Sequence, residues 1–439
     1  MKKFRLNSTQ IIIGSFLIVI IFSAFLLSLP ISSKLGHRTN FLDCIFTSTS
    51  ALCVTGLVVF DTATYWSIFG QIIILILIQL GGLGIIMVTE MIIILIGQKV
   101  SLFQRATLQQ ALSVQKVGGI VKLTKFVIKG TIIIELIGSF FLFLHFKNEF
   151  PFIKAIWLSI FHSISAFCNA GFDLMGFRGK FQSLYSLQTN ILVNTTIMIL
   201  IVLGGLGFIV WDDILKKKLN FHKYKLQTKL VLFTTFFLII IPFLFFYFFE
   251  FKNYPRESRF LVSMFQSITT RTAGFNTISP DTLSDASKGI TILLMLIGGS
   301  PGSTAGGMKT TTFIVMLIST LSIFRKENEA TIFNRRIKIE IIRNALAIFI
   351  MYVYFFLISG FIICLIENIT LLEALYETSS AIGTVGSSLG VTINLSTVSK
   401  IIIIFLMYMG RVGGLTFIYA IMPSLNKKSE YIYEDVTVG

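Results

Sequence analysis

The chain has 439 residues, of which 54% are hydrophobic and only 13% are charged, and its formal net charge is +16. A soluble globular protein carries about 25% charged residues, so this chain has too few polar side chains to cover a surface exposed to water. The composition therefore excludes a soluble protein and predicts an integral membrane protein.

Long apolar segments recur along the whole chain, and several reach the roughly 20 residues that cross a bilayer. The first is too long for a signal-peptide core and has no small-residue cleavage site, so we interpret it as a membrane helix. Eight spanning helices are expected, near 10–29, 69–97, 126–146, 187–211, 229–250, 288–324, 340–366 and 398–424.

Between the two spans of each successive pair lies a segment that is too short or too polar to span. Each begins with mixed apolar and small residues at a roughly helical spacing, and each ends in a short Ser/Thr-rich stretch with a glycine. Half-helices of this kind are tolerated at membrane depth only where they line water or are buried in protein. The segments are 41–57, 152–172, 258–275 and 371–387, and their glycines lie 115, 103 and 112 residues apart.

The expected fold class is therefore all-α integral membrane, with four tandem helix–pore half-helix–helix (M1-P-M2) repeats around a pseudo-four-fold pore and eight spanning helices. The third repeat is one residue shorter between its serine and its glycine, so the symmetry is approximate. The units are repeat 1 at 1–100, repeat 2 at 101–218, repeat 3 with a broken second helix at 219–327, repeat 4 at 328–425 and a cytosolic tail at 426–439.

The four glycine-bearing stretches predict a selectivity filter. A monovalent cation that loses its water needs a ring of oxygen dipoles, which backbone carbonyls supply, and a glycine in each strand permits the unusual backbone angles. The negative C-terminal ends of the half-helices would also favour a cation. We expect K+ at the carbonyls of Val54, Thr55, Gly56, Asn169, Ala170, Gly171, Thr272, Ala273, Gly274, Thr384, Val385 and Gly386.

The sixth span is too long for one helix, and its middle holds five glycines and a proline. Broken backbone at that depth must face a cavity, so we expect a gate beneath the filter. A nucleotide P-loop is excluded, because Met308 displaces the lysine of the motif by one residue and no strand precedes it. The expected gate residues are Gly298, Gly299, Ser300, Pro301, Gly302, Ser303, Thr304, Ala305, Gly306, Gly307, Lys309 and Arg411.

Several further residues are singled out by their places in this pattern. Arg411 lies in the middle of the last span, where a charge is costly and usually functional. It is either a barrier to ions or one half of a buried ion pair, for instance with Glu90. Arg271 is expected to brace the third filter strand by donating to carbonyls. Asp173 is a candidate for the outer vestibule, or else an ordinary solvated loop residue.

Glycines also recur in each second helix of the four repeats. They serve either close helix packing or the lining of a pore, and the sequence leaves both open. These glycines lie within 80–84, 203–207, 297–300 and 409–414.

The distribution of basic residues predicts topology. Segments 2–5, 99–125, 216–229, 325–343 and 427–428 hold 22 of the 37 Lys and Arg residues. With eight spans all of them face one side, which the positive-inside rule places in the cytoplasm. We therefore expect a multi-pass protein of the bacterial cell (plasma) membrane with both termini cytoplasmic. Its basic loops would attract anionic membrane lipid, and nucleic acid is not an expected partner.

No enzyme chemistry is indicated. The four cysteines show no metal-ligand or disulfide spacing, and we interpret them as packed side chains. The four histidines lie at scattered depths, and His162 alone falls in a half-helix. The constellation of acid, base and nucleophile that a membrane enzyme needs is missing.

Together these motifs resemble the Trk/Ktr/HKT superfamily of potassium transporters over essentially the whole chain, most closely the membrane subunit of the bacterial Ktr system. The resemblance implies that Gly56, Gly171, Gly274 and Gly386 are the filter glycines, that 298–310 is an intramembrane gating loop and that Arg411 is a barrier. It also implies a homodimer on a cytosolic nucleotide-binding regulatory ring (KtrA-like). Sodium-preferring relatives carry serine at the first filter glycine, so Gly56 points to potassium.

The expected function is therefore potassium uptake through the filter, gated by the loop and by Arg411. Uptake is expected to be passive or stimulated by sodium, and the sequence leaves open whether sodium is co-transported or only activates. No covalent cofactor is expected, and nucleotide would bind only to the partner. The alternative is a sodium-coupled carrier with alternating access, or a subunit that translocates sodium itself; such carriers usually show inverted repeats.

Overall fold

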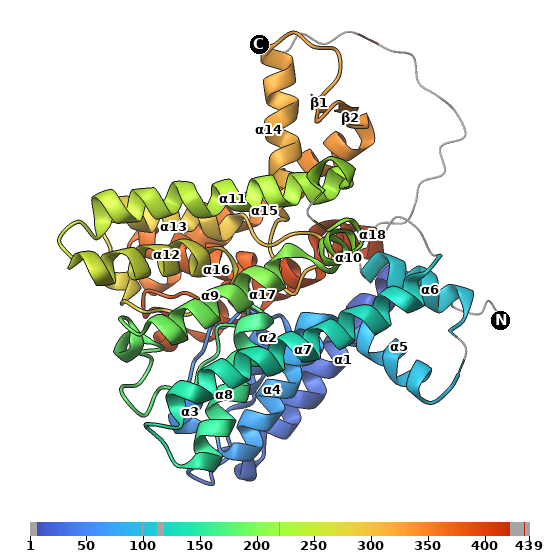
Figure 1. The fold of residues 1–439 in the computed structure, drawn as a ribbon. Coiled ribbons are helices and arrows are strands. Elements are labelled where there is room, and N and C mark those ends of the chain that lie inside the picture. The colour runs from blue at the N-terminus through green and yellow to red at the C-terminus, as the bar shows by residue number, and fades with distance from the viewer. Residues whose placement is uncertain (1–6, 99, 112–117, 219, 422–433, 435–439) are drawn as a thin grey trace.

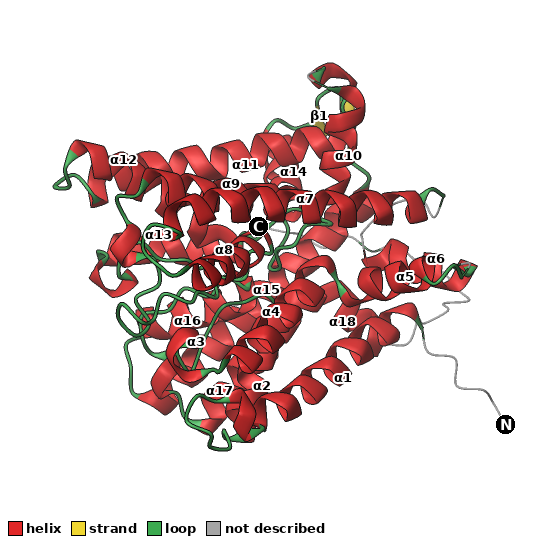
Figure 2. Cartoon of the chain, turned by 60° about the horizontal axis from the view of Figure 1, so that its bottom comes forward, coloured by secondary structure: helices red, strands yellow, loops and turns green. Residues whose placement is uncertain are grey.

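The computed structural model describes residues 7–98, 100–111, 118–218, 220–421 and 434. The tail expected at 426–439 therefore lies outside the described residues, apart from Glu434. The described part is mostly helical, and its strands form one short antiparallel hairpin, β1 (Thr331–Ile332) with β2 (Arg335–Arg336) (Figure 2). The expectation of a mostly helical protein with apolar helices is confirmed.

Four times along the chain a long helix is followed by a shorter one, and we call these the outer helices and the half-helices (Figure 1). The outer helices are α1 (Ser8–Ser28), α7 (Ile120–Phe146), α11 (Leu226–Phe245), extended by a π-helical turn to Glu250, and α15 (Ile339–Glu367). The half-helices are α2 (Phe41–Leu52), α8 (Phe152–Phe167), α12 (Arg256–Thr272) and α16 (Leu371–Gly383).

After each glycine-bearing stretch the chain forms a pair of helices, which we call the inner helices. The pairs are α4 (Ile68–Leu83) with α5 (Ile85–Leu95), α9 (Ile191–Leu206) with α10 (Phe208–Lys217), α13 (Asp285–Leu296) with α14 (Thr310–Phe324), and α17 (Thr397–Val412) with α18 (Gly414–Ile421). Two short helices complete the described set, α3 (Thr62–Tyr65) and α6 (Leu102–Ala111).

The continuous helices expected over 69–97, 187–211 and 398–424 are wrong. Helices α4 and α5 meet at 93°, and α9 and α10 meet at 94°. The breaks fall on Gly84, Gly207 and Gly413, whose φ angles lie between 88° and 93°. Only glycine adopts this backbone conformation readily. The sequence shows these glycines, but it does not show which member of a cluster turns the chain.

The half-helices begin where their sequences supply N-terminal caps. The Asn40 side chain accepts from the Leu42 amide at the start of α2, and Thr370 with Glu373 forms a capping box at the start of α16. Helices α8 and α12 begin after Pro151 and Pro255. Proline has no backbone N–H, so a helix that extended further toward the N-terminus would lose a hydrogen bond at the proline. Both helices therefore start directly after it.

Each outer helix, with the half-helix and the inner helices that follow it, forms one unit, and the units are numbered 1 to 4 along the chain. The packing of the four units is cyclic. The first inner helix of each unit contacts the half-helix of the next: α4 with α8, α9 with α12, α13 with α16, and α17 with α2. The last contact returns from the end of the chain to its beginning. The structure therefore closes a ring of four units, and the glycine-bearing stretches meet at its centre.

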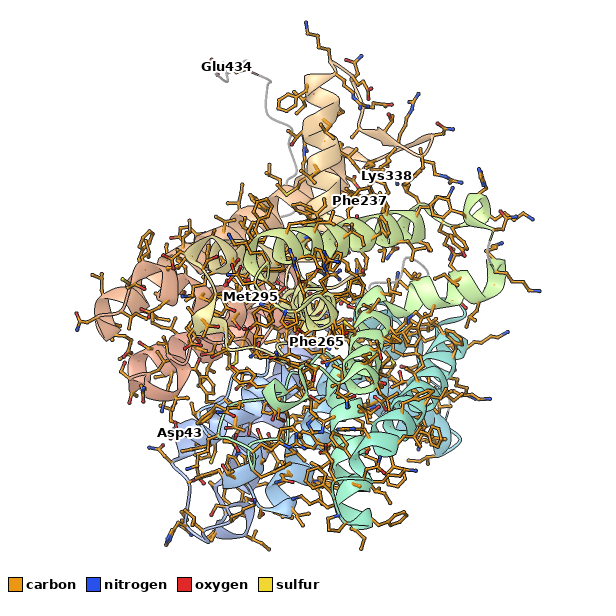
Figure 3. The ribbon with its side chains drawn as sticks, turned by 60° about the vertical axis from the view of Figure 1, so that its left-hand side comes forward. Asp43, Phe237, Phe265, Met295, Lys338 and Glu434 are labelled. Carbon is orange, nitrogen blue, oxygen red and sulfur yellow. The ribbon has the colours of Figure 1, made fainter. Side chains whose placement is uncertain are left out.

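The outer surface is apolar, as expected for contact with lipid. Phe237 of α11 is 41% exposed, whereas Phe265 of α12 and Met295 of α13 are fully buried inside the helix assembly (Figure 3). Among the described residues four helices are long and apolar enough to cross a membrane, or six if each bent pair is one span. Eight spans thus remain a prediction.

Candidate functional site

The chain leaves each half-helix through a sharp turn that places the glycine-bearing stretch. In units 1, 2 and 4 this turn is a Schellman motif. In unit 2 the Ala170 amide donates to the Ser165 carbonyl and the Asn169 amide to the Ala166 carbonyl, at 2.8 and 3.1 Å. The same pair of bonds recurs in units 1 and 4.

The residue that takes the left-handed conformation in this motif is not glycine. Val54, Asn169 and Thr384 have φ angles of 57°, 60° and 53°. A left-handed β-branched residue costs free energy, so backbone strain is stored at Val54 and Thr384, two residues before the glycine, whereas asparagine adopts this conformation more readily. The sequence does not reveal these three residues, because unusual backbone angles are expected of glycine and not of valine, asparagine or threonine.

Unit 3 leaves its half-helix differently. Helix α12 runs to Thr272, and the amides of Ala273 and Gly274 both donate to the Thr269 carbonyl, at 2.9 and 3.2 Å. Here the first left-handed residue is Gly274 itself, with φ 71°. The missing residue between Ser267 and Gly274 removes the position that Val54, Asn169 and Thr384 occupy elsewhere. The shorter third stretch thus has a direct structural consequence.

The four glycines form a closed ring. A Cβ added to Gly56 would come within 3.0 Å of the Ala170 carbonyl, and one on Gly171 within 3.0 Å of the Ala273 carbonyl. The same holds for Gly274 against Val385, and for Gly386 against Thr55. Each glycine therefore lies against the carbonyl that precedes the glycine of the next unit. All four glycines have positive φ, between 70° and 94°, so any other residue is strained at these positions.

Hydroxyl groups behind the ring fix the strands. The same register of each half-helix carries Ser50, Ser165, Thr269 or Ser380. Ser165 and Thr269 donate to the carbonyls of Phe172 and Phe275, one residue beyond the glycine, at 2.6 and 2.7 Å. Ser380 accepts from the Gly386 amide at 3.0 Å, whereas the Ser50 hydroxyl is buried without a partner among the described residues. Three of the hydroxyls at this register thus hydrogen-bond to the glycine-bearing strands.

The inner-helix glycines allow close packing. A Cβ on Gly81, Gly204 or Gly410 would come within 3.0 Å of the carbonyl of Leu52, Phe167 or Ile382, which ends a half-helix. Of the two interpretations left open by the sequence, close packing therefore describes these three glycines.

The segment between α13 and α14 folds back beneath the ring. It is pinned to helix α9 by the Thr304 amide, which donates to the Gly204 carbonyl, and by the Ser300 amide, which donates to the Gly205 carbonyl, at 3.2 and 3.0 Å. The Thr304 hydroxyl donates to the carbonyl of Phe167 at 2.9 Å.

The same hydroxyl also accepts from the side-chain amide of Asn169 at 2.9 Å, and Asn169 accepts from the Thr272 hydroxyl at 2.7 Å. On the far side of the segment, the Gly307 amide donates to the Gly410 carbonyl of α17 at 3.0 Å. The segment is thus tied to units 2 and 4 as well as to its own unit.

Arg411 connects three units through backbone carbonyls. Its guanidinium donates to the carbonyls of Thr304 and Gly81, and to that of Gly82 at 3.1 Å. Within the described residues it forms no ion pair with Glu90, so that alternative is wrong. Lys309 donates to the Ala305 carbonyl at 2.8 Å, which ties the segment to itself.

Arg271 does not do what its position suggested. It is 5% exposed, its Nε is buried without a hydrogen-bond partner, and in the described part of the chain it donates to no carbonyl. The expectation that it braces the third strand through carbonyls is wrong.

Two cavities lie on opposite sides of the glycine ring and the segment beneath it. The outer cavity, of about 330 Å³, is lined by the four glycines and by Asp61, Asp173, Asp281 and Lys180. The inner cavity, of about 230 Å³, is lined by Gly82, Ser303, Lys309 and Arg411 among others. An acidic chamber and a basic one are therefore separated by the ring and the segment.

The acidic side chains of the outer cavity differ in their environments. Asp61 accepts from the Thr64 amide and from the Phe181 amide, at 2.8 and 3.0 Å, so it ties two loops together. Burial raises the pKa of the Asp173 carboxyl to about 6, and the nearby negative charge of Asp61 acts in the same direction. Asp173 thus lies in the outer cavity and is not an ordinary solvated loop residue.

Comparison with known proteins shows which family model, relatives and solved structure this chain resembles. The family model TrkH, described as a cation transport protein, matches residues 3–429. The potassium/sodium uptake protein NtpJ of Enterococcus hirae is 37% identical over 99% of this chain and 97% of its own. The Ktr system potassium uptake protein B of Bacillus subtilis is 36% identical over 100% of this chain and 98% of its own. The crystal structure of the potassium transporter TrkH from Vibrio parahaemolyticus has a TM-score of 0.72 and 17% identity, over 96% of this chain and 87% of its own.

Proposed function

This chain belongs to the TrkH family of cation transport proteins, as the resemblance seen in its sequence implied, and we propose that it takes up K+ through the ring of four glycine strands. It is a potassium/cation uptake transporter and not an enzyme. The observation that carries the proposal is the cyclic contact of Gly56, Gly171, Gly274 and Gly386, each against a carbonyl of the next unit.

Selection by this ring follows from its construction. Carbonyl oxygens that replace the hydration shell must keep their spacing, and the hydroxyls of Ser165, Thr269 and Ser380 hold the strands from behind. The half-helices end at the ring, so the negative ends of their dipoles favour a cation there. We propose that the carbonyls of residues 54–56, 169–171, 272–274 and 384–386 bind K+.

Gating is proposed for the segment 298–310 together with Arg411. The segment lies between the ring and the inner cavity, and it is held by bonds to α9 and α17. Arg411 places a positive charge beside it and donates to the Thr304 carbonyl. A cation that passes the ring would meet both, and displacement of the segment would open the path.

Sodium is the second candidate ion. The relative from Enterococcus hirae carries potassium and sodium in its name and is the more similar of the two relatives above. In this chain Gly56 occupies the first filter position, where the resemblance implies serine in sodium-preferring proteins. We therefore propose potassium as the transported ion, with sodium as an activator.

Assembly is proposed from the same relatives. The relative from Bacillus subtilis is named as potassium uptake protein B of a Ktr system. We propose that this chain works as a homodimer with a cytosolic nucleotide-binding regulatory ring, in the cell membrane, with eight spans and both termini cytoplasmic. Helix α14 and the hairpin β1–β2 project from the rest of the molecule (Figure 1). This projection, with Arg335 and Arg336, is the proposed docking surface.

Uptake measured in a bacterial strain that lacks its own potassium transporters tests the proposal. The chain should restore K+ uptake, and Gly56→Ser should lower its preference for K+ over Na+. Arg411→Ala should change the rate of uptake. Comparing each in the presence and absence of sodium separates activation from transport. Uptake indifferent to both substitutions would contradict the filter and the gate together.

A further inference from the structure

Each half-helix carries a buried polar side chain at one equivalent position, and this side chain has no role in the filter proposed above. It lies nine residues before the filter glycine in units 1, 2 and 4, and eight before it in the shorter unit 3. All four side chains are at most 2% exposed. They are Thr47, His162, Gln266 and Glu377.

Glu377 holds the chain that leaves the fourth filter strand. Its Oε1 accepts from the Leu389 amide at 3.0 Å and from the Ser388 hydroxyl at 2.6 Å, while its Oε2 accepts from the Thr392 hydroxyl. Three donors converge on one carboxyl group. Burial raises the pKa of Glu377, while the hydrogen bonds that it accepts act in the opposite direction.

His162 makes the corresponding contact in unit 2. Its Nε2 accepts from the Leu174 amide at 3.3 Å, and its Nδ1 lies 2.7 Å from the Leu158 carbonyl of its own helix. A ring that accepts at Nε2 must be neutral and carry its proton on Nδ1. Leu174 and Leu389 each stand three residues past their filter glycine. The two side chains therefore accept hydrogen bonds from equivalent backbone amides.

The other two units lack this hydrogen bond. The Thr47 hydroxyl donates to the Asp43 carbonyl one turn back on its own helix, at 2.9 Å. Gln266 is 1% exposed, and among the described residues no backbone amide of the loop that follows Gly274 donates to its side chain. Because the units follow one another around the ring, units 2 and 4 lie opposite each other. The hydrogen bond from the amide three residues past the glycine to a half-helix side chain is thus present in two opposed units of the four.

We propose that Glu377 and His162 are positioning residues that set the preference for K+ over Na+, by fixing the outer ends of two opposed filter strands. The proposal rests on the filter proposed above. Removing either side chain frees the strand three residues past its glycine and leaves an amide without a partner. The two ions differ in radius by a fraction of an ångström, so a small displacement of the carbonyls would admit Na+.

The test compares substitutions at this register in the same transport-deficient strain, with K+ and Na+ as the ions and with the amount of protein in the membrane measured. Glu377→Ala and His162→Phe should each lower the K+/Na+ uptake ratio about three- to tenfold. Glu377→Gln and His162→Gln keep an acceptor at the same place and should largely restore the ratio. Thr47→Val and Gln266→Leu are the matched controls and should leave it unchanged.

A merely structural role predicts another result. It would lower the amount of transporter, and with it the uptake of both ions in proportion, with the ratio unchanged, and that result would overturn the proposal. If Glu377→Ala does not reach the membrane, Ser388→Ala combined with Thr392→Val removes two of its donors from the loop side. An unchanged ratio in that double variant would equally overturn it.

Gly386→Ser separates this proposal from the one on which it rests. If the glycine substitution changes the ratio and the Glu377 and His162 variants do not, the filter stands and the positioning role is refuted. If none of them changes the ratio, the filter assignment itself fails.

Discussion

The glycine ring and the segment 298–310 lie next to each other, but they are held in different ways. Each filter strand is shaped mainly by bonds to its own half-helix, such as those from Ala170 to Ser165 and from Ser165 to Phe172. The segment is held by bonds between units, such as those from Thr304 to Phe167 and from Arg411 to Thr304.

This difference would separate the role in selection proposed for the ring from the role in gating proposed for the segment. The strands keep their shape as long as their half-helices remain folded, because their bonds close over a few residues. The position of the segment depends on α9 and α17, which belong to other units. A shift of those helices would therefore release the segment while the ring keeps its carbonyl spacing. The predictions below test the two halves of this comparison in turn.

The largest effect is expected in the ring. Gly274→Ala places a Cβ within 3.0 Å of the Val385 carbonyl at a residue with φ 71°, so both contact and backbone oppose it. K+ uptake should fall on the order of a hundredfold. Gly289→Ala is the control in the same unit, because nothing lies within 4 Å of its added Cβ. Near-normal uptake by Gly274→Ala would contradict the ring.

A smaller effect is expected in the segment. Thr304→Val removes the hydroxyl that donates to Phe167 and accepts from Asn169, so the segment should leave its closed position more often. The rate of K+ uptake should rise about fivefold, with the K+/Na+ ratio unchanged. Ser303→Ala is the matched control, since the Ser303 hydroxyl has no partner among the described residues. A changed ion ratio would argue against separate selection and gating.

The outer cavity should respond to external pH. Burial raises the pKa of Asp173 to about 6, so its carboxyl is charged at about pH 7.5 and mostly neutral at about pH 5. As pH falls through 6, the cavity loses one negative charge while Asp61, Asp281 and Lys180 also face it. The KM for K+ should rise about two- to threefold.

Asp173→Asn provides the control for this pH dependence. It should have the higher KM at both pH values and lose the difference between them. An equal pH response in the variant and the parent protein would assign the effect to another group.

The smallest effect concerns closure of the ring of units. Lys400 of α17 lies 2.7 Å from Asp43 of α2, and in the described part of the chain this is the ion pair that joins two units. Lys400→Met should lower stability by about 1 kcal/mol, seen as a lower thermal unfolding midpoint in detergent. Lys216→Met is the control, because its pair with Asp212 lies within helix α10. The same loss from both variants would show that ring closure is not involved.

Much of the fold could be predicted because it follows from patterns among residues that are close together in the sequence. Apolar runs, Ser/Thr-rich stretches and their even spacing identify a membrane protein with four related units, and the resemblance that they carry is confirmed by the family match. The partners of Arg411 and the failure of Arg271 to bond carbonyls could not be predicted. Each depends on which residues more than 90 positions away are brought close.

The sequence by itself determined the class of protein, the four glycine-bearing stretches and the shortened third one, because composition, period and spacing are properties of neighbouring residues. Only the tertiary structure decided that Val54, Asn169 and Thr384 take the left-handed conformation. It also decided that the inner helices break at Gly84, Gly207 and Gly413, and that His162 and Glu377 hold opposed strands. These features depend on a ring whose last unit packs against its first, and closure of that ring is a property of the whole chain.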